Sequence, residues 1–492
     1  MTERVIVIGS GIAGMCTALA LAHRDFDVTV LERDSAPPPG DADRAFFDWP
    51  RRGAAQFRHP HAFLGLMCNL LQDNYPDLLE DFYAAGARRV DFKDMLSAEL
   101  ADRYRPEPGD DKLWVLMCRR ATIETVLRRY VGRLNNVRIL NGVTVDGPFT
   151  ETDGPALTVT GVKLRRDCVA EHGAMIEADL VVDASGRNSR FPRWFAELGR
   201  NVEEENDDAE IVYYTRHYKL RPGVSEPSRD GKDRAAGDLG YIKYGVFPGD
   251  NGNFALIVCV HNDETELRQA ITDGARFDAI CRSIPGLAPW VAEDVAEPTT
   301  EPFGIGDIRA VWRHYVRDGQ PLARGFFAVG DAALRTNPLY GRGCSTGILH
   351  AHLLAEVLSG SADPVERALT FDARTEAELR PIFDASLRED RSGIRRARAA
   401  ATGKLLEKPD SFKARFGLAF GDALAAATRY NLHVLRGMLR TVNLLEKPGA
   451  FLNDRRTKLI VFAYMLRGRA RNAGARIQRG PSREEMLQLI GD

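Results

Sequence analysis

The sequence Val5-Ile6-Val7-Ile8-Gly9-Ser10-Gly11-Ile12-Ala13-Gly14 joins a run of strand-forming residues to a Gly-x-Gly-x-x-Gly turn. In such a turn the first glycine permits the bend, the second lets the backbone approach a pyrophosphate, and the third lets the next helix pack on the strand. The N-terminus of that helix, expected from Met15 to Ala22, attracts anions because its N–H groups are unpaired and its dipole end is positive. The stretch predicts a dinucleotide-binding unit.

A second expected strand, Val28-Thr29-Val30-Leu31, leads directly into Glu32. This is about the spacing at which a carboxylate accepts hydrogen bonds from the ribose of a bound dinucleotide. A glycine-rich turn that binds no ligand is the alternative, and the position of Glu32 argues against it. These residues alone do not distinguish FAD from NAD.

Length and composition are those of a soluble globular protein. The 492 residues exceed one small core, so we expect two connected domains. No apolar run reaches the length of about 18 residues that a membrane span needs, and the first strand follows Met1 too closely for a signal peptide. We therefore expect a cytoplasmic protein. The seven cysteines form no Cys-x-x-Cys pair, which indicates reduced structural thiols.

A polar loop at residues 51–61 contains Gln56, His59 and His61, and a helix is expected from His61 to Leu79. Two histidines one residue apart can bind a metal, but no carboxylate or cysteine accompanies them at ligand spacing, so we expect no metal and a loop that faces a cofactor. Arg120 stands between an expected strand at 113–118 and an expected helix, where it can contact a phosphate or ribityl oxygen. An ordinary surface arginine is the alternative.

Two later junctions also lead from a strand into a polar turn. The first is the strand at 180–182, followed by Asp183-Ala184-Ser185-Gly186. The second is the strand at 326–329, followed by Gly330-Asp331 and then by Asn337-Pro338-Leu339-Tyr340-Gly341-Arg342-Gly343-Cys344, which opens a helix through Leu358. The backbone of the first turn can lie against a dinucleotide. The start of the helix offers N–H donors to an anionic cofactor group.

The segments between these junctions predict antiparallel structure. Residues 137–140, 157–164 and 175–176 are expected to form a β-meander, and residues 221–238 a polar loop. Residues 211–220 alternate and contain three tyrosines, and strands at 241–247 and 254–260 flank a hairpin signal. Such a sheet leaves one face free to cover a pocket, so we assign this region to substrate binding.

The C-terminal part is helical in pattern and basic. From Arg388 onward, 22 Lys and Arg residues stand against 10 Asp and Glu, a net charge of +12. Solvated outer faces of helices explain such a charge, and a docking surface for an acidic partner or anionic lipid is the alternative. Cations at 455–458 and 467–471 flank apolar residues 459–466, which are too few to span a bilayer. We favour a core helix with snorkelling ends over a patch that meets an anionic surface.

Three spaced motifs together carry a resemblance to a known family. They are the N-terminal glycine turn with Glu32, the segment Asp183 to Gly186, and Gly330-Asp331 followed by Pro338 and Gly341-x-Gly343. With these the chain resembles FAD-dependent monooxygenases of the para-hydroxybenzoate hydroxylase superfamily over residues 5–358. Its variants at 53–61, 183–194 and 337–343 are most similar to the branch that contains bacterial polyether epoxidases. The Trp-x-Trp-x-x-Pro motif of the related flavin halogenases is missing, so halogenation is not expected.

The resemblance implies an α/β fold with a Rossmann-like FAD-binding domain at 1–199 that resumes at 321–370. It also implies an interleaved antiparallel-sheet substrate domain at 200–320 and a helical C-terminal region at 371–492. Glu32 would bind the adenosine ribose, Arg120 the phosphate side of the flavin, Asp331 the ribityl chain, and the loop from Pro338 to Gly343 the isoalloxazine. The predicted cofactor-binding residues are Gly9, Gly11, Ala13, Gly14, Glu32, Arg33, Gln56, Arg120, Asp183, Gly186, Gly330, Asp331, Pro338, Gly341, Gly343 and Cys344.

The implied function is that of an oxygenase. Reduced FAD forms a C4a-hydroperoxide with O2 and passes one oxygen to an apolar alkene or aromatic small molecule, by epoxidation or hydroxylation, in specialised metabolism. NAD(P)H or a partner flavin reductase would reduce the FAD. No catalytic residue is assigned, and Cys344 is expected to be a small buried thiol. The alternatives are a reductase of a prenyl-type double bond, similar to geranylgeranyl reductases, and a flavin-binding module without turnover. Nucleic acid is not expected as a partner, and an anionic surface is one candidate for the basic C-terminal region.

Overall fold

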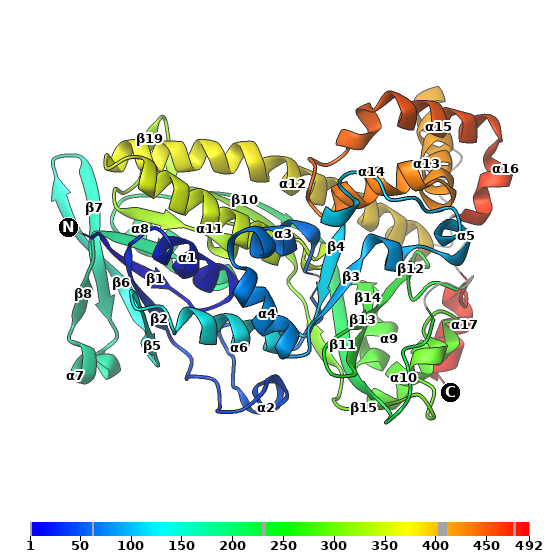
Figure 1. Cartoon of the computed structure of the whole chain (residues 1–492), viewed down its shortest axis with the longest axis horizontal. Coiled ribbons are helices and arrows are strands. Elements are labelled where there is room, and N and C mark those ends of the chain that lie inside the picture. Colours follow the sequence, from blue (N-terminus) through cyan, green and yellow to red (C-terminus); the bar gives the residue numbers. More distant parts are fainter. Residues whose placement is uncertain (1, 62, 229–232, 402–410, 476–478, 492) are drawn as a thin grey trace.

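The computed structural model describes the chain except residues 1, 62, 229–232, 402–410, 476–478 and 492. One half of the molecule is built on a parallel sheet of five strands in the order β20-β9-β1-β2-β5. These are β1 (Arg4–Ile8), β2 (Asp27–Glu32), β5 (Val137–Asn141), β9 (Leu180–Asp183) and β20 (Phe326–Ala328). Helices α1 (Ile12–Ala22) and α11 (Gly343–Gly360) pack side by side on this half of the molecule (Figure 1).

The central strand β1 is buried on both faces. Val5 and Val7 belong to a core cluster shared with the helices. Ile6 and Ile8 belong to a second cluster shared with β6 (Val145–Asp153) and β7 (Ala156–Leu164), which form an antiparallel sheet with β8 (Met175–Glu177). Side chains of a strand alternate between its faces, so a strand covered on both sides is apolar throughout. Residues 5–8 therefore form an uninterrupted apolar run.

The second half of the molecule is an antiparallel sheet in the order β12-β13-β14-β11-β15, with β16 also paired to β11. Its strands are β11 (Ile211–Leu220), β12 (Ala236–Asp238), β13 (Ile242–Pro248), β14 (Asn253–His261), β15 (Ala296–Pro298) and β16 (Phe303–Ile305). Helices α9 (Thr265–Ile271) and α10 (Gly274–Ser283) share the core of one face, which contains Tyr214 and Tyr218. Tyr213 belongs to a different cluster and so lies on the other face. The mixed α/β fold with this sheet is the one expected from the sequence.

Three local expectations are wrong. Strand β5 pairs in parallel with β2, with Val137 opposite Val28, and the meander consists of β6, β7 and β8 instead. The long helix expected from His61 is two helices, α3 (Gly65–Asn74) and α4 (Pro76–Ala84). Pro76 disfavours helical backbone in the residue before it, and Tyr75 accordingly has φ −141° and ψ 58°. The loop expected at 221–238 ends in the strand β12.

The C-terminal region is helical, as expected. Helix α12 (Pro364–Ala401) runs along the molecule from the parallel sheet towards α13 (Phe412–Tyr430), α14 (Leu432–Val442), α15 (Arg455–Leu466) and α16 (Arg469–Asn472), which gather at one end (Figure 1). Helix α17 (Arg483–Gly491) packs on α10. No helix in the described part of the chain is long and apolar enough to cross a membrane.

The remaining elements connect these layers. They are α2 (Ala42–Asp48), β3 (Arg88–Asp91), α5 (Ala98–Ala101), β4 (Trp114–Met117), α6 (Arg120–Val131), α7 (Val169–His172), α8 (Phe191–Glu197), β10 (Glu203–Asp208), β17 (Arg309–His314), β18 (Val316–Arg317), β19 (Gln320–Pro321) and β21 (Leu334–Arg335).

Candidate functional site

A cavity of about 290 Å³ lies where the carboxyl ends of the parallel strands meet the antiparallel sheet. Ligands of open α/β sheets bind at this edge. Most of the residues predicted to bind a cofactor line the cavity: Gly9, Gly11, Ala13, Glu32, Arg33, Gln56, Arg120, Gly186, Gly330, Asp331, Pro338, Gly341, Gly343 and Cys344. The structure thus brings together in one place residues from five separate parts of the chain, at 9–33, 56, 120, 186 and 330–344.

Two predicted residues, Gly14 and Asp183, do not line the cavity but shape its wall. A Cβ atom on Gly14 would lie 1.9 Å from the carbonyl oxygen of Gly9, so only glycine fits there. A Cβ atom on Gly11 would meet no heavy atom within 4 Å, which leaves that backbone open to a ligand. Asp183 is fully buried and accepts a hydrogen bond of 2.9 Å from the backbone N–H of Ser185. Its carboxylate braces the turn after β9.

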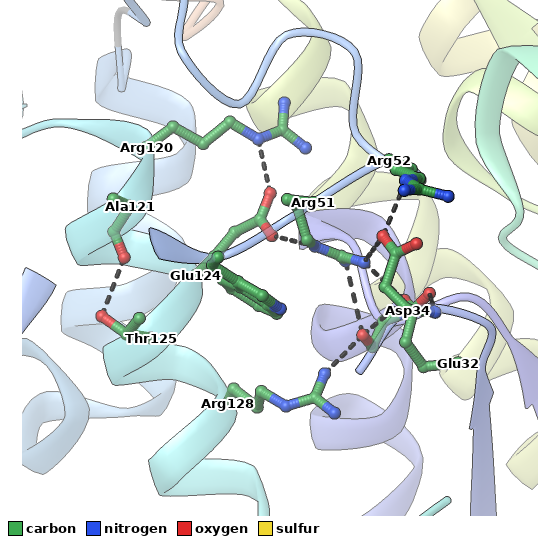
Figure 2. Close-up of polar contacts among 12 residues, drawn as sticks. Glu32, Asp34, Arg51, Arg52, Arg120, Ala121, Glu124, Thr125 and Arg128 are labelled. Carbon is green, nitrogen blue, oxygen red and sulfur yellow. Dashed lines mark hydrogen bonds and ion pairs between the residues drawn. The ribbon is translucent and has the colours of Figure 1, made fainter. Parts of the chain in front are cut away.

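A buried network of charges connects the glycine turn to α6 (Figure 2). The side chain of Arg51 is only 1% exposed. Its Nη1 lies 2.8 Å from Glu32 Oε2 and 2.9 Å from Asp34 Oδ2, and its Nε donates to Glu124 Oε2 at 2.9 Å. The loop at 51–61 is thereby fixed to both β2 and α6, since one guanidinium serves three carboxylates.

Two further arginines extend the network along α6. Arg120 donates to the second oxygen of Glu124, and Arg128 donates to the hydroxyl of Ser10. Arg51, Arg120 and Arg128 together balance the three carboxylates of the network. Buried charges are tolerated when they are paired in this way, and removing one partner leaves an uncompensated charge.

Glu32 lines the cavity, yet its carboxylate is already engaged. Its Oε2 accepts from the backbone N–H of Ser10 at 2.9 Å, and its Oε1 accepts from the backbone N–H of Asp34 at 2.9 Å. Burial alone would raise its pKa, but the nearby Arg51 guanidinium and these hydrogen bonds outweigh burial and lower the pKa of Glu32 to about 2. Glu32 is therefore ionised, and it organises the turn as well as facing the ligand space.

The lining of the cavity carries excess positive charge. Arg33, Arg187 and Arg190 line it, and none of them forms an ion pair with a carboxylate in the described part of the chain. Unpaired guanidinium groups in a concave site attract anionic ligands, and their planar donors suit phosphate oxygens. The cavity therefore favours a ligand that carries phosphate groups.

Asp331 also lines the cavity. Its carboxylate makes no hydrogen bond with any described residue, and burial raises its pKa. An unsatisfied acceptor of this kind favours a ligand with hydroxyl donors. Gly341 has φ +68° at the turn before α11, and Gly343 begins the helix beside the cavity. Burial raises the pKa of the Cys344 thiol to about 12, so that the thiol is neutral, as expected for a small buried cysteine.

The antiparallel sheet contributes an aromatic wall. The ring of Tyr213 packs edge-to-face on His59 with centroids 5.1 Å apart, and His59 Nδ1 lies 2.8 Å from Thr215 Oγ1. His61 lines the cavity, and its Nε2 lies 2.9 Å from Arg120 Nη1. Burial lowers the pKa of His59 to about 3 and that of His61 well below its usual value, so both rings are neutral near pH 7.

Comparisons with known proteins point to the class of cofactor. Residues 4–46 match the family described as FAD dependent oxidoreductase. Protein Rv3254 of Mycobacterium tuberculosis is 27% identical over 72% of this chain and 73% of its own length. An FAD-dependent monooxygenase of Aspergillus terreus is 23% identical over 72% of this chain and 77% of its own. The chain is an FAD-dependent oxidoreductase that is similar to monooxygenases. Its fold is similar to that of p-nitrophenol 4-monooxygenase PnpA from Pseudomonas putida, with a TM-score of 0.56 and 18% identity over 91% of this chain and 98% of that one.

The donor set of the cavity fits FAD. The opening beside Gly11, the unpaired arginines and the unpaired carboxylate of Asp331 match a molecule that has a pyrophosphate and several hydroxyls. The N-terminus of α11 adds N–H donors near the Asp331 end of the cavity.

Sequence reasoning missed Arg51, Arg187 and Arg190 as site residues. Arg187 and Arg190 follow the turn after β9, where basic residues next to Gly186 are a signal for phosphate binding. Arg51 has no such signal, because its partners Asp34 and Glu124 are distant in sequence.

Proposed function

We propose that this oxidoreductase transfers one oxygen atom from O2 to an apolar alkene or an electron-rich aromatic ring, by epoxidation or hydroxylation, in specialised metabolism. One observation supports the proposal above all. A single cavity is lined by the glycine turn, by Asp331 and by Tyr213 of the antiparallel sheet. A cofactor and an apolar substrate can therefore meet in it. The sequence variants at 53–61, 183–194 and 337–343 favour the polyether epoxidase branch.

The proposed cofactor contacts follow from the donor and acceptor positions. The backbone at Gly11 and the guanidinium groups of Arg33 and Arg187 hold the pyrophosphate, and Glu32 accepts from the adenosine ribose through the lone pairs that the protein leaves free. Asp331 accepts from ribityl hydroxyls. The N-terminus of α11 places positive charge beside the isoalloxazine and stabilises its reduced anion. Bound FAD supplies the oxygen-activating chemistry once it is reduced.

The protein positions the substrate and excludes water. The buried ring of Tyr213 lines the cavity without charge and packs on the neutral ring of His59, which suits an apolar molecule. Exclusion of water strengthens the electrostatic effect of the α11 terminus on the flavin. We further propose NAD(P)H or a partner flavin reductase as the electron source, and contact of the C-terminal region with a membrane surface.

The test uses the purified, flavin-loaded protein with NADH, NADPH or an added flavin reductase. Apolar alkenes and phenols are offered as substrates, and oxygen uptake is measured together with incorporation of isotope-labelled O2 into product. We expect substrate-dependent uptake and one labelled oxygen per product. A saturated product formed without oxygen would identify a double-bond reductase. The proposal would be contradicted if no substrate increased the rate at which O2 reoxidises the reduced flavin.

A further inference from the structure

Helix α15 exposes a stripe of large apolar side chains. Leu459, Phe462 and Leu466 are 70%, 57% and 73% exposed. Residues at these spacings lie on one face of a helix. The opposite face carries the buried Val461 and Tyr464, which pack in a small core with α13. We call Leu459, Phe462 and Leu466 the α15 stripe.

The α15 stripe corrects an expectation from the sequence. Residues 459–466 do form a helix, but the favoured interpretation as a core helix is wrong for this face. Helix α15 has apolar residues on both faces, and only the face with Val461 and Tyr464 packs against other elements of the protein. A contiguous apolar patch with a polar rim on a soluble protein marks an interaction surface.

The rim of the α15 stripe is basic. Arg455, Arg456, Lys458 and Arg467 are exposed, and none of them forms an ion pair with a described residue. The acidic neighbour, Asp454, is engaged as the helix cap, since it accepts from the backbone N–H of Thr457 at 2.7 Å. The cations of the rim therefore remain available to an anionic partner.

We propose that the α15 stripe and its basic rim dock on a membrane surface that contains anionic lipids. Apolar side chains of such a helix enter the boundary between headgroups and acyl chains, while Lys and Arg side chains contact the headgroups. A second copy of the chain is a poorer occupant, because two copies would bring Arg455, Arg456, Lys458 and Arg467 against their own equivalents, and like charges repel. The net charge of +12 from Arg388 onward likewise favours an anionic surface over a second copy of the chain.

Docking adds to the proposed function without depending on it. A membrane surface concentrates apolar small molecules, so an enzyme held there meets a poorly soluble substrate more often. In Figure 1, α15 lies at the far end of the molecule from the parallel sheet, so contact at α15 leaves the cofactor half free.

The test is co-flotation of the full-length, flavin-loaded protein with vesicles. One set is phosphatidylcholine alone, and the other is an equal mixture of phosphatidylcholine and phosphatidylglycerol. We expect binding to the mixed vesicles and little to the neutral ones. Binding should fall as NaCl rises from about 0.1 M to about 1 M, because the screening length drops from about 10 Å to about 3 Å. A protein that does not float with anionic vesicles, or floats equally with neutral ones, overturns the proposal.

Two triple variants separate the contributions. Replacing Arg455, Arg456 and Lys458 with Gln should weaken binding to mixed vesicles about 100-fold, given the usual contribution of each cation at an anionic surface. Replacing all three residues of the α15 stripe, Leu459, Phe462 and Leu466, with Ser should abolish flotation. Flavin content and the urea midpoint should stay unchanged in both, since these side chains are exposed. The matched control is Met175→Ser on β8, a 44% exposed apolar residue elsewhere on the surface.

The outcomes distinguish the possible occupants. A wild-type dimer in solution that the α15 stripe variant converts to a monomer, without vesicle binding, would assign this face to a second copy. Wild-type flotation that both triple variants retain would place the membrane contact elsewhere and overturn the proposal. Normal flotation of a protein that shows no oxygen transfer would support docking and count against the proposed function alone.

Discussion

Replacing Arg51 with Met should be among the most damaging single changes in this protein. The side chain of Arg51 is 1% exposed, and its partner Glu124 is 2% exposed. Met keeps the unbranched apolar stem but removes the guanidinium, which leaves Glu32, Asp34 and Glu124 without their shared cation. Breaking a buried ion pair by removing one partner costs about 3–5 kcal/mol. We expect the free energy of unfolding to fall by that amount, because Arg120 compensates only one of the three carboxylates.

The assay is urea unfolding of the flavin-loaded protein, followed by flavin and tryptophan fluorescence. Arg52→Met is the matched control, since Arg52 is exposed and its guanidinium forms no ion pair with a described residue. That control should change stability by less than about 0.5 kcal/mol. Arg51→Lys should be intermediate, because an ammonium group cannot reproduce the planar fork of the guanidinium. A loss below about 1 kcal/mol for Arg51→Met, the range of surface pairs, would refute the reasoning.

The pH dependence gives a second check on the same network. The pKa of Glu32 falls from 4.5 to about 2 on folding. A depressed carboxyl pKa stabilises the folded state above the unfolded value and loses that effect as pH falls through the folded value. In Arg51→Met the main cause of the depression is gone. The stability difference between wild type and variant should therefore narrow as pH drops from 4.5 towards about 2. A difference that widens in this range would contradict the assignment.

Three further predictions concern the cavity. Asp331→Ala should lower the flavin content after desalting more than Asp183→Ala does, because Asp331 faces the cavity and Asp183 is engaged within its turn; equal contents would contradict this division. Gly11→Ala should yield a folded protein with weakened FAD binding, whereas Gly14→Ala should give mostly insoluble protein, because the Cβ atom at position 14 would lie 1.9 Å from a backbone oxygen. Expression yield measures the folding of each variant, and the flavin absorbance spectrum measures its FAD binding. Cys344 should resist alkylation by iodoacetamide at about pH 8 in the native state, since its pKa is about 12, and rapid labelling seen by mass spectrometry would refute this.

The parts of the fold that sequence predicted best depend on short-range pattern. The glycine turn, Glu32 and the start of α11 each combine a strand or helix boundary with residues that only a few conformations accept. Strand β5, which the sequence pattern assigned to the meander, shows the limit of this approach. A short alternating segment has the same sequence pattern in a meander and at the edge of a parallel sheet. The pairing of Val137 with Val28, which is distant in sequence, places β5 in the parallel sheet.

The site was predicted in outline and missed in its internal bracing. Most of the predicted residues that line the cavity belong to motifs. Arg51 forms its ion pairs with Glu32, Asp34 and Glu124 only when β2, the loop at 51–61 and α6 lie together in the fold. Tertiary placement likewise decides which side of α15 is covered, because Leu459 and Val461 are equally apolar. Neither result follows from residue type or spacing alone.

The position of β20 has a bearing on how the protein is synthesised. β20 forms the edge of the parallel sheet beside β9, yet the whole antiparallel sheet is translated between them. At about 5–20 residues per second, the ribosome needs on the order of ten seconds to bridge that interval. During this time β1, β2, β5 and β9 have emerged with an open edge, and Asp331 and α11 do not yet exist. The cavity, whose lining includes Asp331, Gly343 and Cys344, is therefore incomplete until α11 has left the ribosome.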